Sequence, residues 1–129
     1  MVNQPAAPVI LVAEDEPLVL KFIETALGRA GYKVLSATNG VEALRISRSH
    51  TGEIDLLLTD IKMPYMVGPE LASSIVSERP GIRVMIMTGQ SSGQVPDLCR
   101  LELLRKPFIA SQLLERVERT LGSPPTPLL

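Results

Sequence analysis

The chain has 129 residues, a length that favours one domain with one hydrophobic core. Its net charge of −1 gives no electrostatic reason to expect binding to nucleic acid or to an anionic membrane. The single Cys99 cannot form an internal disulfide, and with one histidine in the chain a Cys/His zinc site is excluded. No apolar segment approaches the ~20 residues that span a bilayer, and the N-terminus lacks the pattern of a secretion signal. We therefore expect a protein of the cytoplasm that makes no contact with a membrane.

The first quarter of the chain predicts a buried strand followed by an amphipathic helix. Residues 1–8 form a short lead-in that contains prolines and is expected to be mobile, and the apolar run at 9–13 is typical of a buried strand. Pro17 suits the first turn of a helix, whose N-terminal dipole favours the acidic residues before it. We assign Glu16 to capping this helix alone, and Gly31 ends the helix. Its apolar positions recur at the spacing of one buried stripe: Leu18, Val19, Phe22, Ile23, Ala26, Leu27 and Ala30.

The rest of the chain continues the alternation of strands and helices. In chain order we predict a strand at 33–37, a helix at 41–49 after the Asn39-Gly40 turn, a strand at 54–59, a helix through Leu71, Ile75 and Val76, a strand at 83–88, a strand at 103–105 and a helix through Leu113, Leu114, Val117 and Leu121. Residues 89–102 must connect the last two strands, and their glycines and serines predict a fourth helix that is short or irregular. The proline-rich tail at 122–129 is expected to be disordered.

This order of elements favours an α/β fold in one domain at 9–121. Strands that alternate with helices form βαβ units, which place parallel strands in one sheet with helices on both faces. In a doubly wound sheet of this kind the carboxyl ends of all strands open on the same edge, where ligands bind. Polar residues at the ends of the strands are therefore the candidates for a functional site.

Four of the five predicted strands end in a polar residue. Glu14 and Asp15 follow the first strand, Asp60 the third, Thr88 ends the fourth and Lys106 follows the fifth. Three carboxylates close together repel one another unless a proton or a cation intervenes. Oxygen ligands without histidine or cysteine favour a hard cation, and Mg²⁺ binds one or two carboxylates and leaves room for phosphate oxygens. The pattern predicts a site for Mg²⁺ and a phosphoryl group.

The residue types in this set suit phosphoryl transfer to a carboxylate. An Asp60 oxygen can attack phosphorus and hold it as an acyl phosphate, and the metal neutralises the charge that opposes this attack. Lys106 supplies a positive charge to phosphate oxygens, Thr88 offers a hydroxyl donor, and Gly89 leaves the approach open. We therefore expect Asp60 to be the nucleophile and the site of attachment.

Four motifs together resemble the receiver domains of two-component response regulators over about residues 9–121. They are Glu14-Asp15, Asp60 with Met63-Pro64, Thr88-Gly89 and Lys106-Pro107-Phe108, each at its own strand end. The resemblance implies a flavodoxin-like sheet of five parallel strands in the order 2-1-3-4-5. It also implies that Asp60 is the phosphoacceptor, and that Thr88 and Lys106 contact the phosphoryl group and transmit its presence. The implied Mg²⁺ ligands are Asp15, Asp60 and the backbone carbonyl of Lys62, with Glu14 acting through a water.

Two positions bear on how phosphorylation is read and how long it lasts. The family's switch aromatic stands three residues before the strand-five lysine, and here that position is Leu103, which offers neither a ring nor a hydroxyl. With the short crossover at 89–102, this favours recognition of partners through the first helix and its neighbours. Lys62 is a candidate for shielding the phosphoryl group from water, and the alternative is a solvated loop lysine. Unchanged dephosphorylation of a Lys62→Ala variant would refute the shielding role.

Three functions are open on the sequence alone. The first is a signalling module that takes a phosphoryl group from a histidine kinase or a histidine phosphotransfer protein. The second is a Mg²⁺-dependent phosphohydrolase of the haloacid dehalogenase type, which is disfavoured because Lys62 stands where that family has its general-acid Asp. The third is a flavodoxin-like cofactor module, which the acidic residues after the first strand oppose because they would repel a phosphate.

The signalling module is the interpretation that we favour. Such a protein assists its own phosphorylation and dephosphorylation rather than acting as an enzyme, and phosphorylation changes its binding to a downstream protein. It is either a stand-alone regulator or the receiver part of a hybrid histidine kinase. A second copy of the chain is a further candidate partner, and no direct contact with nucleic acid is expected.

Overall fold

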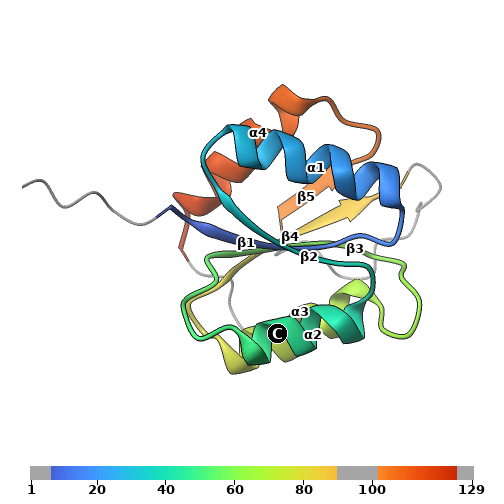
Figure 1. Ribbon diagram of the computed structural model, residues 1–129, viewed down its shortest axis with the longest axis vertical. Helices are drawn as coiled ribbons and strands as arrows, with labels where there is room; N and C mark the ends of the chain where they lie inside the picture. Colours follow the sequence, from blue (N-terminus) through green and yellow to red (C-terminus); the bar gives the residue numbers. More distant parts are fainter. Residues whose placement is uncertain (1–6, 90–101, 125–129) are drawn as a thin grey trace, which may run out of the picture.

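Strands and helices alternate along the two stretches that the structure, a computed structural model, describes: residues 7–89 and 102–124. The strands are β1 (Val9–Ala13), β2 (Lys33–Ala37), β3 (Leu56–Asp60), β4 (Arg83–Thr88) and β5 (Glu102–Arg105). The helices are α1 (Pro17–Arg29), α2 (Gly40–Ser49), α3 (Gly68–Glu78) and α4 (Ala110–Leu121). All strands pair in parallel in the order β2-β1-β3-β4-β5. Helices α1 and α4 cover one face of the sheet and α2 and α3 the other (Figure 1). The predicted fold class and strand order are confirmed.

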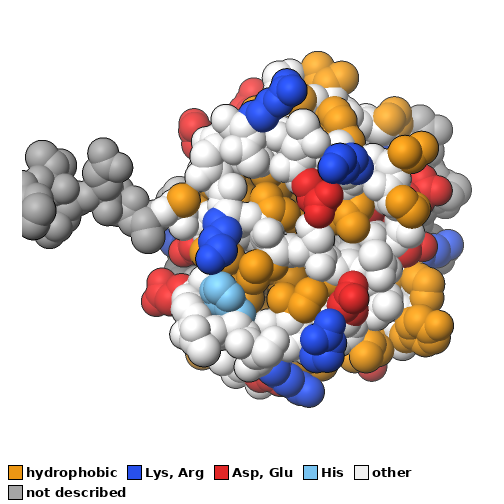
Figure 2. All heavy atoms as spheres, viewed as in Figure 1, with side chains coloured by type: hydrophobic (Ala, Val, Ile, Leu, Met, Phe, Trp, Pro, Cys, Tyr) orange, Lys and Arg blue, Asp and Glu red, His pale blue; other side chains and the backbone are white. Residues whose placement is uncertain are grey.

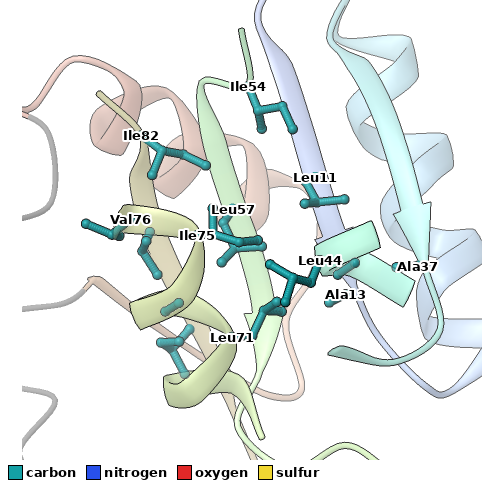
Figure 3. Packing of buried hydrophobic residues seen from close by; sticks show 14 of the residues in the cluster. Leu11, Ala13, Ala37, Leu44, Ile54, Leu57, Leu71, Ile75, Val76 and Ile82 are labelled. Carbon is teal, nitrogen blue, oxygen red and sulfur yellow. The ribbon is translucent and has the colours of Figure 1, made fainter. Parts of the chain in front are cut away.

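The alternation of side chains along each strand builds two hydrophobic clusters, one on each face of the sheet. In β1, Leu11 joins the cluster under α2 and α3, whereas Ile10 and Val12 join the cluster under α1 and α4. On the first of these faces, Leu71 and Ile75 of α3 are fully buried against the sheet, as Figure 3 shows. Packing from both sides therefore holds the central strands whose ends carry the polar residues.

Helix α1 turns toward the sheet a stripe that overlaps only partly with the predicted one. Leu18 and Phe22, expected in the core, leave 85% and 40% of their surfaces exposed. Both stripes have helical spacing, so periodicity alone does not choose between them. The buried positions are Leu20, Ile23, Ala26 and Leu27. The ring of Phe22 instead meets that of Phe108 in the loop before α4, with the centroids 6.1 Å apart. Glu16 is the N-cap residue, as predicted, but its side chain makes no capping hydrogen bond.

Strand β3 begins two residues later than predicted and includes Asp60. The backbone N–H of Asp55 donates to the carbonyl of Val9 at 2.8 Å, and the Asp55 carboxylate accepts from the Val9 N–H at 2.8 Å. Asp55 thus ties the start of β3 to β1. At the other end of β3, Asp60 pairs in register with Met87 of β4. The backbone of Asp60 is therefore part of the sheet, which fixes the origin of its side chain.

Three predictions concern residues that lie wholly or partly outside the described ranges: the lead-in at 1–8, the fourth helix within 89–102 and the tail at 122–129. Cys99 lies outside these ranges as well. Of the helices in the part of the chain that the structure describes, none is long and apolar enough to cross a membrane.

Candidate functional site

A cavity of about 190 Å³ opens at the carboxyl ends of the central strands. Its lining comes from the ends of four strands and comprises Glu14, Asp15, Glu16, Asp60, Ile61, Lys62, Met87, Gly89 and Lys106. Parallel pairing explains this convergence, because it places the ends of all strands on one edge of the sheet. The structure thus brings five of the predicted site residues together: Glu14, Asp15, Asp60, Lys62 and Lys106.

Three carboxylates converge in this cavity. One ligand oxygen from each of Glu14, Asp15 and Asp60 lies within 4.8 Å of the other two. Glu14 is fully buried and Asp60 is 6% exposed, whereas Asp15 is exposed. The cluster therefore offers hard oxygen ligands with one side open to water, a combination that suits Mg²⁺ or a similar cation. An acidic cluster that could hold a metal lies where the sequence predicts one.

Lys106 bridges two of these carboxylates. Its Nζ lies 2.7 Å from Oε1 of Glu14 and 2.7 Å from Oδ1 of Asp60. The backbone N–H of Lys106 donates to the carbonyl of Thr88 at 2.7 Å, which holds the residue beside the end of β4. The second carboxylate oxygen of Glu14 accepts from the backbone N–H of Glu16 at 3.0 Å. The buried Glu14 thus has a partner for each of its oxygens, as a buried charge requires.

Burial and mutual contact shift the protonation of these groups in different directions. Burial, and then the hydrogen bond with the Glu14 carboxylate, raises the pKa of Asp60 to about 8, although Lys106 opposes the rise. Burial also acts to raise the pKa of Glu14, but hydrogen bonds from Asp60, Lys106 and the Glu16 amide outweigh it and hold that pKa below its usual value. For Lys106, burial acts to lower the pKa, and the two carboxylates reverse this and raise it. Without metal, Asp60 therefore carries a proton near neutral pH, while Glu14 and Lys106 are ionised.

The remaining predicted positions lie beside the centre of the cavity. Thr88 ends β4 between the lining residues Met87 and Gly89, but its own buried side chain is not part of the lining. Lys62 is exposed at the cavity mouth. Leu103 lies on β5 and packs half-buried against the cluster under α2 and α3. The contact of Thr88 with a phosphoryl group, the shielding role of Lys62 and the switch role of Leu103 stay predictions.

Two contacts of the site are not foreseen in the sequence. The backbone N–H of Glu16 holds the buried Glu14 carboxylate, a contact made by the main chain and therefore independent of residue type. Gly68 begins α3 and lies against the backbone of Asp60, where a Cβ would come within 1.9 Å of the carbonyl oxygen. The available signal for Gly68 is a glycine next to Pro69 at the start of a predicted helix, which is too common to single out.

Comparison with known proteins gives one consistent result. The family model for the response regulator receiver domain matches residues 10–118. The chain is similar to the response regulator receiver protein CpdR of Brucella abortus (strain 2308), with 36% identity over 116 aligned residues, covering 87% of this chain and 95% of CpdR. It is similar to the sensor kinase CckA of the same organism, with 34% identity over 116 residues, covering 87% of this chain but 12% of CckA. Similarity to the transcriptional regulatory protein GlrR of Escherichia coli (strain K12) is 34% over 97 residues, covering 75% of this chain and 20% of GlrR.

Solved structures agree with this result. A receiver domain protein from Clostridium thermocellum matches with a TM-score of 0.80 and 32% identity, covering 89% of this chain and 94% of that one. The receiver domain of the hybrid histidine kinase CckA matches with a TM-score of 0.70 and 34% identity, covering 88% and 98% of the two chains. The chain spans a fifth or less of CckA and GlrR, but nearly all of CpdR. The chain belongs to the response regulator receiver domain family.

Proposed function

We propose that Asp60 accepts a phosphoryl group from a histidine kinase or a histidine phosphotransfer protein in a Mg²⁺-dependent reaction, and that this changes binding to a downstream protein. The strongest support is the Lys106 ammonium, 2.7 Å from both Glu14 and Asp60 and beside a third carboxylate. Such a cluster favours binding of a cation, and Lys106 places a positive charge next to the proposed acceptor. Membership of the receiver family supports the same function for residues 9–121, which we take as the receiver unit.

Transfer is a displacement at phosphorus. An Asp60 carboxylate oxygen forms the new P–O bond while the bond from phosphorus to the donor imidazole nitrogen breaks, and the electron pair leaves with that nitrogen. Asp60 must first lose its proton, because only the carboxylate is nucleophilic. Lys106 then faces the phosphoryl oxygens and stabilises their charge. By the family resemblance, the Thr88 hydroxyl, which lies just outside the cavity lining, would donate a hydrogen bond to the same oxygens.

The side chains present fit a Mg²⁺ ion. Asp15, Asp60 and the backbone carbonyl of Lys62 would hold it, and Glu14 would act on it through a water. When bound, the ion supplies the positive charge that lets an anionic carboxylate approach an anionic donor. The exposure of Asp15 leaves room for the waters that Mg²⁺ retains. Glu14 suits the indirect role, because protein groups already bind both of its oxygens.

The phosphohydrolase alternative lacks support at the residue that it needs most. Rapid turnover requires a proton donor two residues after the nucleophile, and Lys62 is exposed there and provides no carboxylic acid. We therefore propose that the protein assists its own phosphorylation and dephosphorylation without turning over a separate substrate.

The proposed partners are proteins rather than nucleic acids. The relatives include a sensor kinase and transcriptional regulators, which contain the matching domain within longer chains. On the face seen in Figure 2, basic and acidic side chains of the described residues are interspersed, and the net charge is −1. That distribution suits contact with a protein surface better than with a polyanion. We propose that the exchange takes place in the cytoplasm, with a second copy of the chain as a further candidate partner.

Incubation with Mg²⁺ and acetyl phosphate, followed by measurement of the intact mass, tests the assignment of Asp60. We expect the parent protein to gain one phosphoryl group, and we expect no gain in Asp60→Asn or in the parent with EDTA. Asp55→Asn is the matched control, because Asp55 lies at the opposite end of β3 and asparagine keeps an acceptor for the Val9 N–H. No gain in the parent, or a gain in Asp60→Asn, would refute the assignment. Multiple-turnover release of phosphate from small phosphomonoesters would support the phosphohydrolase instead.

A further inference from the structure

The first residue of helix α3, Gly68, lies against the peptide group that follows Asp60, the proposed phosphoacceptor. The N–H of Gly68 donates to the carbonyl of Ile61 at 2.7 Å. A Cβ on Gly68 would lie 1.9 Å from the carbonyl oxygen of Asp60 and 2.9 Å from its carbonyl carbon, whereas ordinary van der Waals contact begins at 3.4 Å. Both neighbours are backbone atoms, so no flexible side chain can move aside. A residue larger than glycine therefore fits at this position only if the backbone moves.

The carbonyl of Asp60 has a second contact, from Thr59. The hydroxyl of the fully buried Thr59 donates to this carbonyl at 3.0 Å, with the sulfur of Met63 3.8 Å away. The carbonyl oxygen is thus held by a hydrogen bond and by the close approach of Gly68. Rotation of this peptide group would move the functional groups near it, which are the Asp60 carboxylate and the carbonyl of Lys62.

Helix α3 is poorly able to withdraw and make room. Leu71 and Ile75, on the following turns of the helix, are fully buried against the sheet (Figure 3). An outward movement of α3 by more than an ångström would break close packing in this cluster, and interiors resist such gaps. A side chain at position 68 therefore displaces the backbone of Asp60 rather than the helix.

We propose that Gly68 and Thr59 are positioning residues for the phosphoacceptor. Together they fix the carbonyl of Asp60, and thereby the direction in which the Asp60 carboxylate faces Lys106 and the other acids. Neither residue touches the reacting atoms, and each acts through the backbone of Asp60. The inference rests on the proposed role of Asp60, but Mg²⁺ binding and the metal-free protein test it separately from phosphorylation.

Gly68→Ala and Thr59→Val test this proposal against two controls. Gly28→Ala adds a Cβ that meets nothing within 4 Å. Ile75→Val loosens the packing of α3 without reaching Asp60, and so reproduces a loss of stability alone. For each purified protein we would measure three quantities: the free energy of unfolding in urea, the dissociation constant for Mg²⁺ by calorimetry, and the ¹³C chemical shift of the Asp60 carboxyl without metal.

We expect Gly68→Ala to weaken Mg²⁺ binding by about tenfold or more, the range seen when groups that orient metal ligands are changed. It should also shift the Asp60 carboxyl signal in the metal-free protein. Thr59→Val should show both effects to a smaller degree, while Gly28→Ala and Ile75→Val should stay within about twofold of the parent affinity.

Parent-like Mg²⁺ affinity and an unshifted Asp60 signal in Gly68→Ala would overturn the proposal. An equal loss of Mg²⁺ affinity in Ile75→Val at matched stability would overturn it too. If Gly68→Ala does not fold, Thr59→Val decides by the same criterion, and parent-like values there count against the proposal. A parent protein that binds Mg²⁺ but never gains a phosphoryl group would refute the proposed function and leave these comparisons valid.

Discussion

The Lys106 ammonium contacts two buried carboxylates but neutralises the charge of only one. Asp60 therefore retains a proton in the metal-free protein. A second ionised carboxylate would leave an unbalanced charge at a largely buried position, and protonation removes that charge. Burial and the contact with Glu14 accordingly raise the pKa of Asp60 to about 8. A divalent cation that binds the Asp60 carboxylate would therefore have to displace this proton, and the proposed attack of Asp60 on phosphorus requires the same loss of the proton.

The affinity for Mg²⁺ should rise with pH as a result. Below the Asp60 pKa of about 8, binding releases one proton, so the dissociation constant should fall by about tenfold per pH unit between about pH 6 and about pH 8. Above about pH 8 the ionisation of Asp60 should give no further increase in the affinity for Mg²⁺. Calorimetry in two buffers with different ionisation enthalpies measures the affinity and the number of protons released. A dissociation constant that is constant across this range would show that Asp60 is already ionised.

Asp60→Asn should stabilise the metal-free protein. The folded-state pKa of about 8 lies above the ordinary value of 3.8, so this carboxyl favours folding below about pH 4 and loses that contribution as the pH rises through about 8. Asparagine does not ionise, and we expect a gain in the free energy of unfolding on the order of 1–3 kcal/mol near pH 8 and a smaller gain near pH 5. Urea denaturation at both pH values provides the measurement. An equal effect at the two pH values would contradict the ionisation argument.

The side chain of Arg79 connects the end of helix α3 to the end of helix α2. Its guanidinium donates to the hydroxyl and the carbonyl of Ser47, and to the carbonyls of His50 and Gly52, at 2.7 to 2.9 Å. These carbonyls lie in the last turn of α2 and the loop after it, where a helix leaves acceptors without partners. One side chain thus completes the hydrogen bonding of a helix end and sets the distance between two helices.

Removing this side chain should destabilise the fold. Arg79→Ala leaves several carbonyls without a donor, and we expect a loss of about 1–3 kcal/mol in the free energy of unfolding. Arg48→Ala is the matched control, because Arg48 makes an exposed ion pair with Glu78 at 2.8 Å between the same two helices and should matter little. Thermal and urea unfolding of both variants would distinguish the two contacts. Comparable losses would show that charge, rather than capping of carbonyls, joins the helices.

Features that depend on local pattern follow from the sequence, whereas features that depend on contact between distant atoms do not. The apolar runs predict the bounds of three strands as they are observed: 9–13, 33–37 and 83–88. Parallel pairing then brings the carboxylates at the strand ends together, as predicted. The stripe of α1 that faces the sheet depends on the shape of the core, which is why Leu18 is misplaced. The contact of Gly68 with Asp60 depends on how a loop folds back, and no periodicity encodes that.

In the molecule as a whole, an exposed apolar surface lies on the side of the sheet that α1 and α4 cover. It consists of Leu18 and Phe22 on α1, which are 85% and 40% exposed, and Ile109 before α4, which is 63% exposed. The ring of Phe108 extends it by its contact with Phe22. Leu18 follows Asp15 closely along the chain and Ile109 follows Lys106, so the segments that carry this surface begin near residues that line the cavity. We expect a donor protein for Asp60 to contact this surface.

Leu18→Glu should slow transfer from a phosphorylated histidine donor protein by about tenfold or more, because a charge would enter the apolar contact. Phosphorylation by acetyl phosphate should be unchanged, since Leu18 does not line the cavity. Val41→Glu is the matched control, because Val41 is 51% exposed and lies on α2, on the other face of the sheet. Transfer rates with a radiolabelled donor protein provide the measurement. Slower transfer in Val41→Glu alone would place the recognition surface on α2.

If donor recognition lies on the α1 side as we expect, the two faces of the sheet separate recognition of the donor from the geometry of Asp60. Gly68 anchors the acceptor loop from the α3 side, whereas Leu18 and Phe22 are displayed on the α1 side. Substitutions on the α1 side can therefore alter which donor is accepted without reaching the peptide group of Asp60. Duplicated copies of such a domain can diverge into insulated signalling routes while sharing one chemical step.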